Sequence, residues 1–162
     1  MYSSLSKNPT IVFVFKFAIV HTITYLFFGV TFMLLSNYFD FFAKDPIMSI
    51  VMKSSDALSV RLAAPVQLIR GTLIGLVIFP FRSIILDDKN GWLKLFWLLY
   101  ILTSVGAVIT GPGSIEGFLY TNFSYNPLIG VPEITIQMLV FSWCFCKWMK
   151  SEKKMIKSHK IH

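Results

Sequence analysis

Long apolar stretches alternate with short polar segments along this chain. The apolar stretches lie at about 11–35, 61–86, 92–110 and 132–148. Helices of about 17–25 apolar residues cross the hydrocarbon core of a bilayer. The pattern therefore predicts an all-α, polytopic membrane protein. It has four transmembrane helices and short interfacial helices in a single integral membrane domain, residues 1–162.

The first apolar stretch predicts a retained signal-anchor. It is longer than the apolar core of a signal peptide, and no small-residue cleavage site follows it. Lys16 is expected to extend toward the nearer interface, and the aromatic residues within 38–42 mark the far one. Asp45 and Pro46 then predict the start of a short interfacial helix, because an acidic cap followed by proline favours a first helical turn.

Breaker residues separate the remaining spans. The segment 87–91, Asp-Asp-Lys-Asn-Gly, predicts a polar turn between the second and third spans, and 111–113, Gly-Pro-Gly, ends the third. Pro65 predicts a kink in the second span. Gly71 and Gly75 form a small-xxx-small pattern, which permits close approach of another helix.

Composition and charge support a membrane protein. The chain is 55% hydrophobic and 14% charged, whereas soluble domains are roughly 25% charged. The net charge is +7, and six lysines lie in the last sixteen residues. A basic segment directly after an apolar stretch, here 149–162, predicts a cytoplasmic tail lying on anionic lipid. No zinc-finger, helix-turn-helix or RNP pattern accompanies these charges, so nucleic-acid binding is not expected.

The distribution of basic residues predicts the orientation. Eleven lysines and arginines fall near the N-terminus, in the 82–94 turn and in the tail, against three in the first outer loop. Basic residues accumulate on the cytoplasmic side of multi-pass proteins. Both termini are therefore expected in the cytoplasm, and the plasma membrane is the expected location.

All three arginines, Arg61, Arg70 and Arg82, lie within one apolar stretch, whereas the other twelve basic residues are lysines. If Arg82 marks the cytoplasmic interface, Arg70 lies about 18 Å deeper at the helical rise per residue. That depth is near the middle of the hydrocarbon core, where an arginine costs about 2.5–3.5 kcal/mol. Arg70 therefore requires an anion or a polar cavity, and Arg61 lies near the outer interface.

Two acidic residues in the outer half of the protein are predicted partners for these arginines. Glu133 opens the fourth span, and Glu116 follows the third. In one hypothesis, Arg61 and Arg70 form interhelical ion pairs with them that fix the packing of the bundle. In the other, Arg70 remains free to receive an external anion.

Polar side chains recur at helical spacing in every span and predict a hydrated central pocket. His21 lies in the first span, Gln67 shares a face with Arg70, Tyr100 lies in the third span, and Glu133 opens the fourth. A ligand at Arg70 would be lined by Gln67, His21 and Tyr100. The alternative is that these groups form hydrogen bonds between helices.

Catalytic arrangements are not evident. The sequence contains no nucleophile elbow and no pair of carboxylates placed for acid–base chemistry. Cys144 and Cys146 have no second cysteine pair, so no metal site is predicted, and no cofactor is expected.

Three classes of function stay open. A non-enzymatic accessory or assembly component, working with a partner membrane protein or a second copy, is preferred. The others are a protein that binds or transports an anionic or lipid-like ligand, and a lipid-modifying enzyme.

Overall fold

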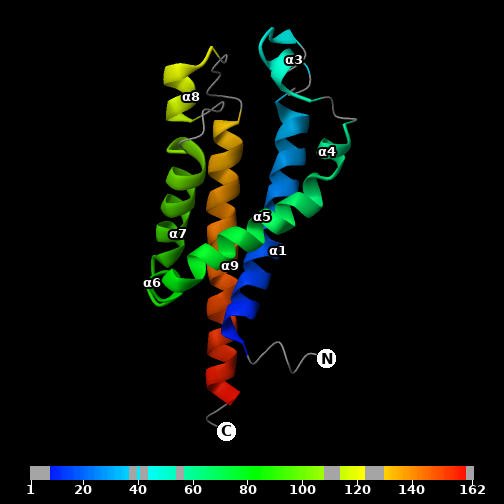
Figure 1. Ribbon diagram of the computed structural model, residues 1–162. Helices are drawn as coiled ribbons and strands as arrows, with labels where there is room; N and C mark the ends of the chain where they lie inside the picture. Colours follow the sequence, from blue (N-terminus) through cyan, green and yellow to red (C-terminus); the bar gives the residue numbers. More distant parts are fainter. Residues whose placement is uncertain are drawn as a thin grey trace.

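The computed structural model describes residues 8–36, 40, 44–53, 57–107, 114–122 and 130–159, and every element in these ranges is helical (Figure 1). The prediction of an all-α protein is confirmed. In chain order these elements are α1 (Pro9–Leu35), α3 (Met48–Val51), α4 (Leu58–Arg61), α5 (Ala63–Ile78), a 3-10 turn (Phe79–Phe81), α6 (Arg82–Leu86), α7 (Gly91–Tyr100), a π-helix (Ile101–Val105), α8 (Ile115–Tyr120) and α9 (Val131–His159).

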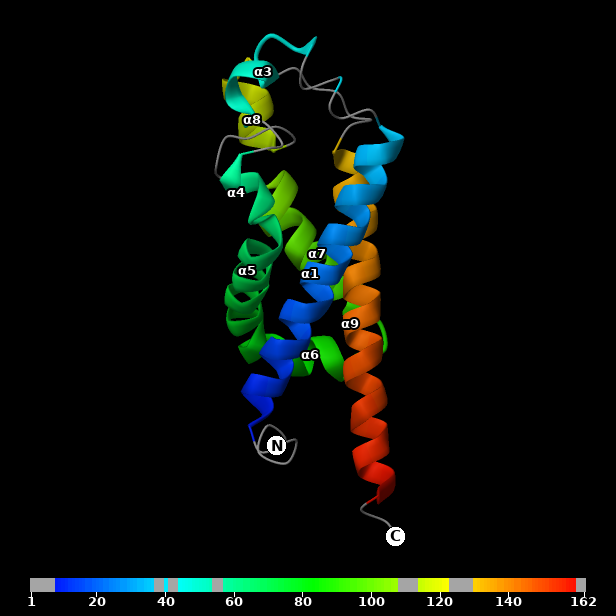
Figure 2. The ribbon, with the colours of Figure 1, turned by 90° about the vertical axis from the view of Figure 1, so that its right-hand side faces the viewer.

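The long helices pack in a chain of neighbours. α5 packs on α1, α1 on α9, and α9 on α7, while α6 contacts both α7 and α9. α5 crosses the bundle obliquely in Figure 1. The start of α1, helix α6 and the end of α9 lie at one end of the bundle, and α3, α4 and α8 lie at the other (Figures 1 and 2).

Four phenylalanines form the centre of the core between α1 and α9. Phe13 and Phe17 on α1 meet Phe141 and Phe145 on α9, and all four are at most 2% exposed. The rings of Phe17 and Phe141 are 4.8 Å apart at an edge-to-face angle, and those of Phe13 and Phe145 are 5.0 Å apart. Edge-to-face contacts at this distance stabilise a fold by more than the burial of apolar surface alone. This cluster therefore fixes how α1 crosses α9.

The two glycines of α5 bring it close to α1, as the small-xxx-small pattern predicts. A Cβ atom on Gly71 would lie 2.9 Å from the backbone of Ala18, and one on Gly75 would lie 3.2 Å from the Phe17 side chain. Small residues at a helix contact allow this approach and maximise van der Waals packing. The close approach of another helix is thereby confirmed.

Two segments are long and apolar enough to cross a membrane, judged by length and composition. They are Pro9–Leu35, with mean hydropathy 2.0, and Ala63–Leu86, with mean hydropathy 1.7. The Gly91–Val105 segment is apolar but shorter. α9 has 29 residues, but Glu133, Gln137 and its lysines lower its hydropathy. The described residues thus provide two such segments, where the sequence predicted four spans.

The bounds of the second and third spans differ from those predicted. α5 begins at Ala63, so Arg61 ends the separate helix α4. Pro65 falls in the first turn of α5 instead of kinking a longer helix, because a proline there removes no intrahelical hydrogen bond. The third helical segment ends at Val105, where the Gly106 N–H bonds back to Ile101 O, and not at 110.

The predicted caps and turns form where they lie among the described residues. Asp45 accepts hydrogen bonds from the N–H groups of Ile47 and Met48 at the start of α3. The segment 87–91 is the turn between α6 and α7. The predicted aromatic marker at 38, 39, 41 and 42 and the Gly-Pro-Gly break at 111–113 lie outside the described residues.

A buried lysine connects α1 to the C-terminal part of α9. Lys16 forms an ion pair with Glu152, and its ammonium lies 4.9 Å from the centre of the Trp148 ring. The Lys16 side chain is 9% exposed, and that of Glu152 is 38% exposed. A cation this deeply buried depends on its partner, because an unpaired buried charge is strongly destabilising.

Replacing Glu152 by glutamine is expected to lower the free energy of unfolding by about 1–2 kcal/mol, since Glu152 is partly solvated and screening reduces the effect. Adding Lys16→Met should restore most of the loss, because no charge is then left unpaired. Thermal unfolding in detergent measures both. The exposed Lys44–Asp40 pair is the control: its side chains are 77% and 69% exposed, and Asp40→Asn should have no measurable effect. An equal loss of stability in Glu152→Gln and Asp40→Asn would contradict the expectation that burial makes the Lys16–Glu152 pair the more stabilising one.

Candidate functional site

A small polar cavity lies where α1, α5, α9 and the π-helix meet. His21, Arg70, Thr103 and Gln137, one from each of these elements, contribute to its lining. The remaining lining residues are apolar. Its volume is about 20 Å³, which is enough for about one water molecule. The structure thus brings together polar side chains that the helical spacing placed on separate inward faces.

His21 and Gln67 leave hydrogen-bonding capacity unused beside this cavity. Both residues are 8% exposed, and Gln67 lies beside the His21 imidazole. Even so, His21 Nε2 and Gln67 Oε1 have no hydrogen-bond partner among the described residues. Buried polar atoms are normally satisfied by protein or by ordered water. A water molecule in the cavity, or a polar group of a ligand, would meet this requirement.

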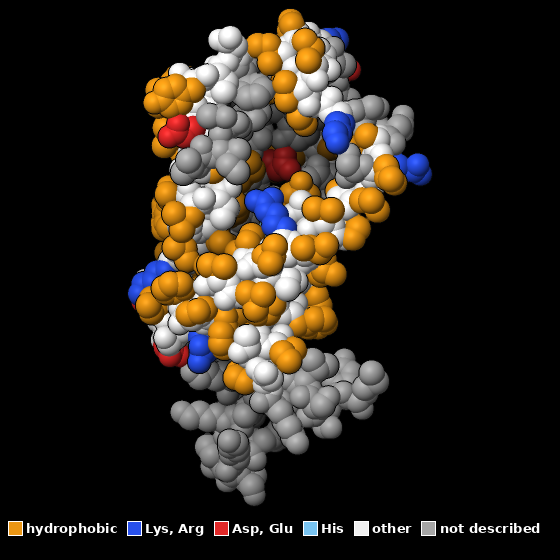
Figure 3. Space-filling model, viewed as in Figure 1, with side chains coloured by type: hydrophobic (Ala, Val, Ile, Leu, Met, Phe, Trp, Pro, Cys, Tyr) orange, Lys and Arg blue, Asp and Glu red, His pale blue; other side chains and the backbone are white. Residues whose placement is uncertain are grey.

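Arg70 lies at the edge of the bundle. It lines the cavity and is close enough to His21 for its charge to act on the imidazole, yet its side chain is exposed. The ion pairs within the described ranges are Lys16–Glu152, Lys44–Asp40 and Lys94–Asp88, and none of them includes an arginine. In the space-filling view, basic and acidic side chains lie around a hollow above α5 (Figure 3).

The predicted acidic partners lie in the half of the protein that contains α8 and the start of α9. Glu133 Oε1 lies 3.7 Å from the position that a Cβ on Gly29 would take, so this carboxylate is beside α1. Glu116 lies in the first turn of α8, where Ser114 accepts a hydrogen bond from the Gly117 N–H. Arg61 is exposed at the end of α4. The pairing of these acids with arginines stays a prediction.

Tyr100 and Gln67 do not line the cavity, although the sequence placed both at the same site. The Tyr100 hydroxyl is hydrogen-bonded to Thr135 Oγ1 at 3.2 Å, which joins α7 to α9. Tyr100 therefore has the interhelical role that was the alternative interpretation of these hydroxyls. Gln67 contacts His21 from the side of α5.

Comparison with known proteins assigns neither a family nor a function to this chain. No family model, curated protein or solved structure matches this chain. Within the described ranges, no group of three or more histidine, cysteine, aspartate or glutamate side chains is placed to hold a metal ion. The function must therefore be argued from the arrangement of the side chains.

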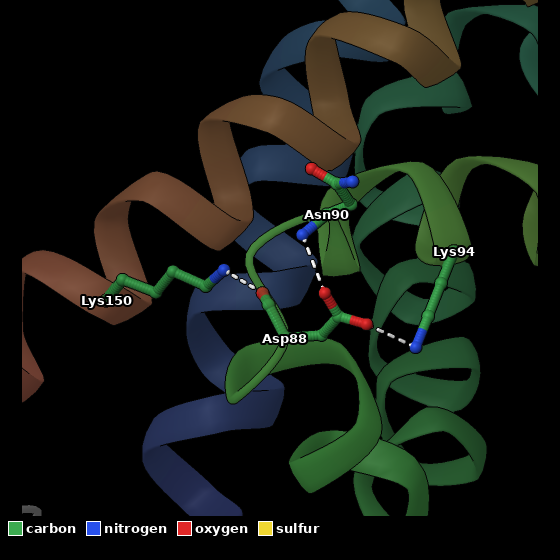
Figure 4. A network of polar contacts seen from close by, with 4 residues as sticks. All are labelled: Asp88, Asn90, Lys94 and Lys150. Atoms are coloured by element: carbon green, nitrogen blue, oxygen red, sulfur yellow. Dashed lines mark hydrogen bonds and ion pairs between the residues drawn. The ribbon is translucent and has the colours of Figure 1, made fainter.

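A second polar network organises the turn between α6 and α7 (Figure 4). The Asp88 carboxylate pairs with Lys94 and accepts a hydrogen bond from the Asn90 N–H, while Lys150 of α9 donates to the Asp88 carbonyl. The Lys94 hydrogen bond, followed by that of Asn90, lowers the pKa of Asp88. The contact is therefore present at neutral pH and is lost as the pH falls through the lowered pKa.

The contact of Lys150 with this turn and the Lys16–Glu152 pair were not predicted from the sequence. Both join residues far apart in the chain: Lys150 and Asp88 by 62 residues, and Glu152 and Lys16 by 136. The sequence does indicate which face of α9 Lys150 occupies. Lys150 shares that face with Trp143 and Lys147, because the three residues follow the i, i+4, i+7 spacing of one side of a helix.

Proposed function

We propose that this chain is a non-enzymatic accessory component of a membrane assembly. In this proposal it crosses the plasma membrane four times with both termini in the cytoplasm. It pairs Arg70 with a carboxylate on a transmembrane helix of a partner protein. The observation that carries the proposal is an exposed arginine, without an ion-pair partner among the described residues, within the apolar segment Ala63–Leu86.

The burial pattern supports a membrane location. Only 22% of the apolar window in the Ala63–Leu86 segment is covered by the rest of the protein. Large apolar side chains such as Ile23, Phe27 and Val77 are more than 60% exposed. A water-soluble monomer rarely exposes apolar surface this extensive. Lipid or a partner helix is the environment that suits it.

The positions of the helix ends support the orientation. The start of α1, the α6–α7 turn and the end of α9 lie together, opposite α3, α4 and α8 (Figure 2). Four crossings with both termini on one side would produce this grouping, and the basic end would face the cytoplasm. The short α7 and the polar residues of α9 would then cross by packing against the two more apolar segments.

The exposed face around Arg70 has the spacing of a helix-packing seam. Val66, Arg70, Leu73 and Val77 follow each other at intervals of four, three and four residues, and all are exposed. This spacing gives one continuous stripe along a helix. A partner helix lying on the stripe would bury its apolar residues and bring a carboxylate to Arg70.

The depth of Arg70 favours a protein carboxylate over the other anions. Headgroup phosphates lie at the interface, whereas Arg70 lies on α5 within the apolar segment Ala63–Leu86, twelve residues before Arg82. A second copy of this chain would not supply the acid at that depth, because its sequence has no aspartate or glutamate in the central part of any predicted span. An intramembrane arginine normally pairs with such a group.

The test is site-specific photo-crosslinking from Leu73 in the native membrane. We expect an adduct with a transmembrane helix that carries an acidic residue near its middle. Arg70→Gln should reduce this adduct at least about tenfold, since a desolvated charge pair contributes 2–5 kcal/mol when broken. Changing the partner's acid to arginine together with Arg70→Glu should restore it.

Arg82→Gln is the matched control. Arg82 donates to the Phe79 carbonyl and lies over the Phe79 ring near the end of the segment, so its loss should leave the adduct unchanged. An adduct that survives Arg70→Gln, or a partner helix without an acidic residue, would overturn the proposal. Loss of folding in Arg70→Gln would instead indicate an ion pair inside the bundle.

A second candidate function is the binding of an anionic or lipid-like ligand at Arg70. The unsatisfied His21 Nε2 and Gln67 Oε1 beside the cavity favour it. Native mass spectrometry of protein extracted from its own membrane distinguishes the two. A small anion retained by the wild type and lost in Arg70→Gln supports the ligand, and a bare subunit in both samples contradicts it.

A further inference from the structure

A groove of about 400 Å³ opens between the start of α7 and the middle of α9. Trp92 from α7 and Trp143 from α9 line it, together with Lys89, Lys147 and Lys150. Its volume lies within the range of small-molecule sites, about 300–1,000 Å³. The groove is separate from the Arg70 cavity, with which it shares no lining residue.

The three lysines make this groove strongly positive. No ion pair in the described part of the chain includes Lys89 or Lys147, and Lys150 donates to a neutral carbonyl, that of Asp88. Two nearby carboxylates pair with lysines outside the groove, although the charge of Lys150 also acts on the Asp88 carboxylate. Asp88 pairs with Lys94, and Glu152 pairs with Lys16. An anion entering the groove would therefore meet ammonium groups that no described carboxylate pairs with.

The aromatic residues indicate which kind of anion fits. The Lys147 ammonium lies 4.4 Å from the centre of the Trp143 ring, and Trp92 lies on the facing helix. Tryptophan and lysine together are typical of the headgroup level of a membrane, where one end of each side chain is apolar and the other is polar. Lys150, which lines the groove, donates to the Asp88 carbonyl in the α6–α7 turn (Figure 4). This turn lies at the same end of the bundle as the start of α1 (Figure 1).

We propose that this groove binds the phosphate headgroup of one anionic phospholipid of the cytoplasmic leaflet. Lys89, Lys147 and Lys150 hold the phosphate, and the two tryptophans lie beside the glycerol region. The inference rests on the proposed membrane location and orientation but not on the role of Arg70. It also differs from diffuse attraction of lipid to the basic tail, because it assigns a single site with defined residues.

The test is native mass spectrometry of the full chain in a neutral detergent, titrated with phosphatidylglycerol or phosphatidylcholine. We expect one retained phosphatidylglycerol, and at least about tenfold weaker binding of phosphatidylcholine. The triple variant Lys89→Gln, Lys147→Gln, Lys150→Gln should weaken phosphatidylglycerol binding on the order of a hundredfold, because each lysine near an anionic headgroup contributes roughly a fivefold factor.

A charge-matched control separates the groove from the tail. Lys153→Gln, Lys154→Gln, Lys157→Gln removes the same charge from the basic tail of the sequence and should change binding less than about threefold. Replacing the three groove lysines by arginine should preserve binding. If the glutamine triple does not fold, Lys147→Gln alone should still weaken binding about fivefold. An equal effect of the tail triple overturns the proposal.

Two further outcomes also overturn it. Phosphatidylcholine binding as tightly as phosphatidylglycerol would show that charge is not recognised. Displacement of the lipid by inorganic phosphate at equal concentration would assign the groove to a free anion. Arg70→Gln should leave the phosphatidylglycerol adduct intact, so a failed Arg70 partnership and a failed lipid site give different results. Extraction of the protein from membranes by alkaline carbonate would instead contradict the membrane location, on which both the Arg70 partnership and the lipid site depend.

Discussion

Replacing Phe17 by alanine is expected to lower the free energy of unfolding by about 2–3 kcal/mol. Phe17 is fully buried, and its ring packs against Phe141 at 4.8 Å and Phe145 at 5.1 Å. A buried phenylalanine in a water-soluble core costs about 3–5 kcal/mol to truncate. We expect less here because lipid is as apolar as the core, so the loss is mainly one of packing.

Phe15 provides the matched control for this prediction. It lies on the same helix, two residues away, and is 59% exposed. Phe15→Ala should change the midpoint of thermal unfolding by no more than about 1–2 °C, whereas Phe17→Ala should lower it by about 4–10 °C for a chain of this size. Unfolding in detergent, followed by circular dichroism, measures both. Equal shifts would show that the α1–α9 contact is not the centre of the core.

Gly91→Ala is expected to disrupt the connection between α6 and α7. A Cβ atom on Gly91 would lie 1.7 Å from the carbonyl oxygen of Ile85 and 2.6 Å from its carbonyl carbon. Both atoms belong to the backbone, so no rotamer change relieves the overlap, and α6 must separate from α7. We expect a loss of about 2–4 kcal/mol, the range of strongly destabilising single substitutions, seen as reduced thermal stability and faster proteolysis at the turn.

Gly29→Ala is the control for Gly91→Ala, since among the described residues the added methyl group would meet Glu133 Oε1 alone, at the ordinary contact distance of 3.7 Å. Its midpoint should equal or slightly exceed that of the wild type, because alanine favours helix over glycine. Similar losses in both variants would mean that the close approach at Ile85 does not determine the effect of Gly91→Ala.

The strongest elements were predictable because they depend on local sequence. The uninterrupted apolar run of α1, the polar turn before Gly91 and the Asp45 cap each need only neighbouring residues. The end of α9 was not predicted: the segment 149–162 was interpreted as a tail, whereas the helix continues to His159. Lysine and glutamate are good helix formers, and the pairing of Glu152 with Lys16 further stabilises this end of the helix.

The site was predictable only in part, since helical spacing gives the face of a side chain but not its neighbours. His21 does share a cavity with Arg70, whereas the polar residues that the third segment and α9 contribute to it are Thr103 and Gln137. Tyr100 does not line this cavity, because its hydroxyl is held by Thr135 on α9. The lysine groove depends on the crossing of α7 and α9, which no local pattern determines.

The unequal lengths of the helices have a consequence for the bilayer itself. The Gly91–Val105 segment has 15 residues, about 22 Å at the helical rise, whereas α1 has 27, about 40 Å. In the proposed placement, the hydrocarbon layer is compressed beside α7, while α1 can tilt to fit a layer of about 30 Å. Hydrophobic mismatch of this kind costs a fraction of a kcal/mol per ångström. Within the plasma membrane, this protein is therefore expected to accumulate where the bilayer is locally thinner.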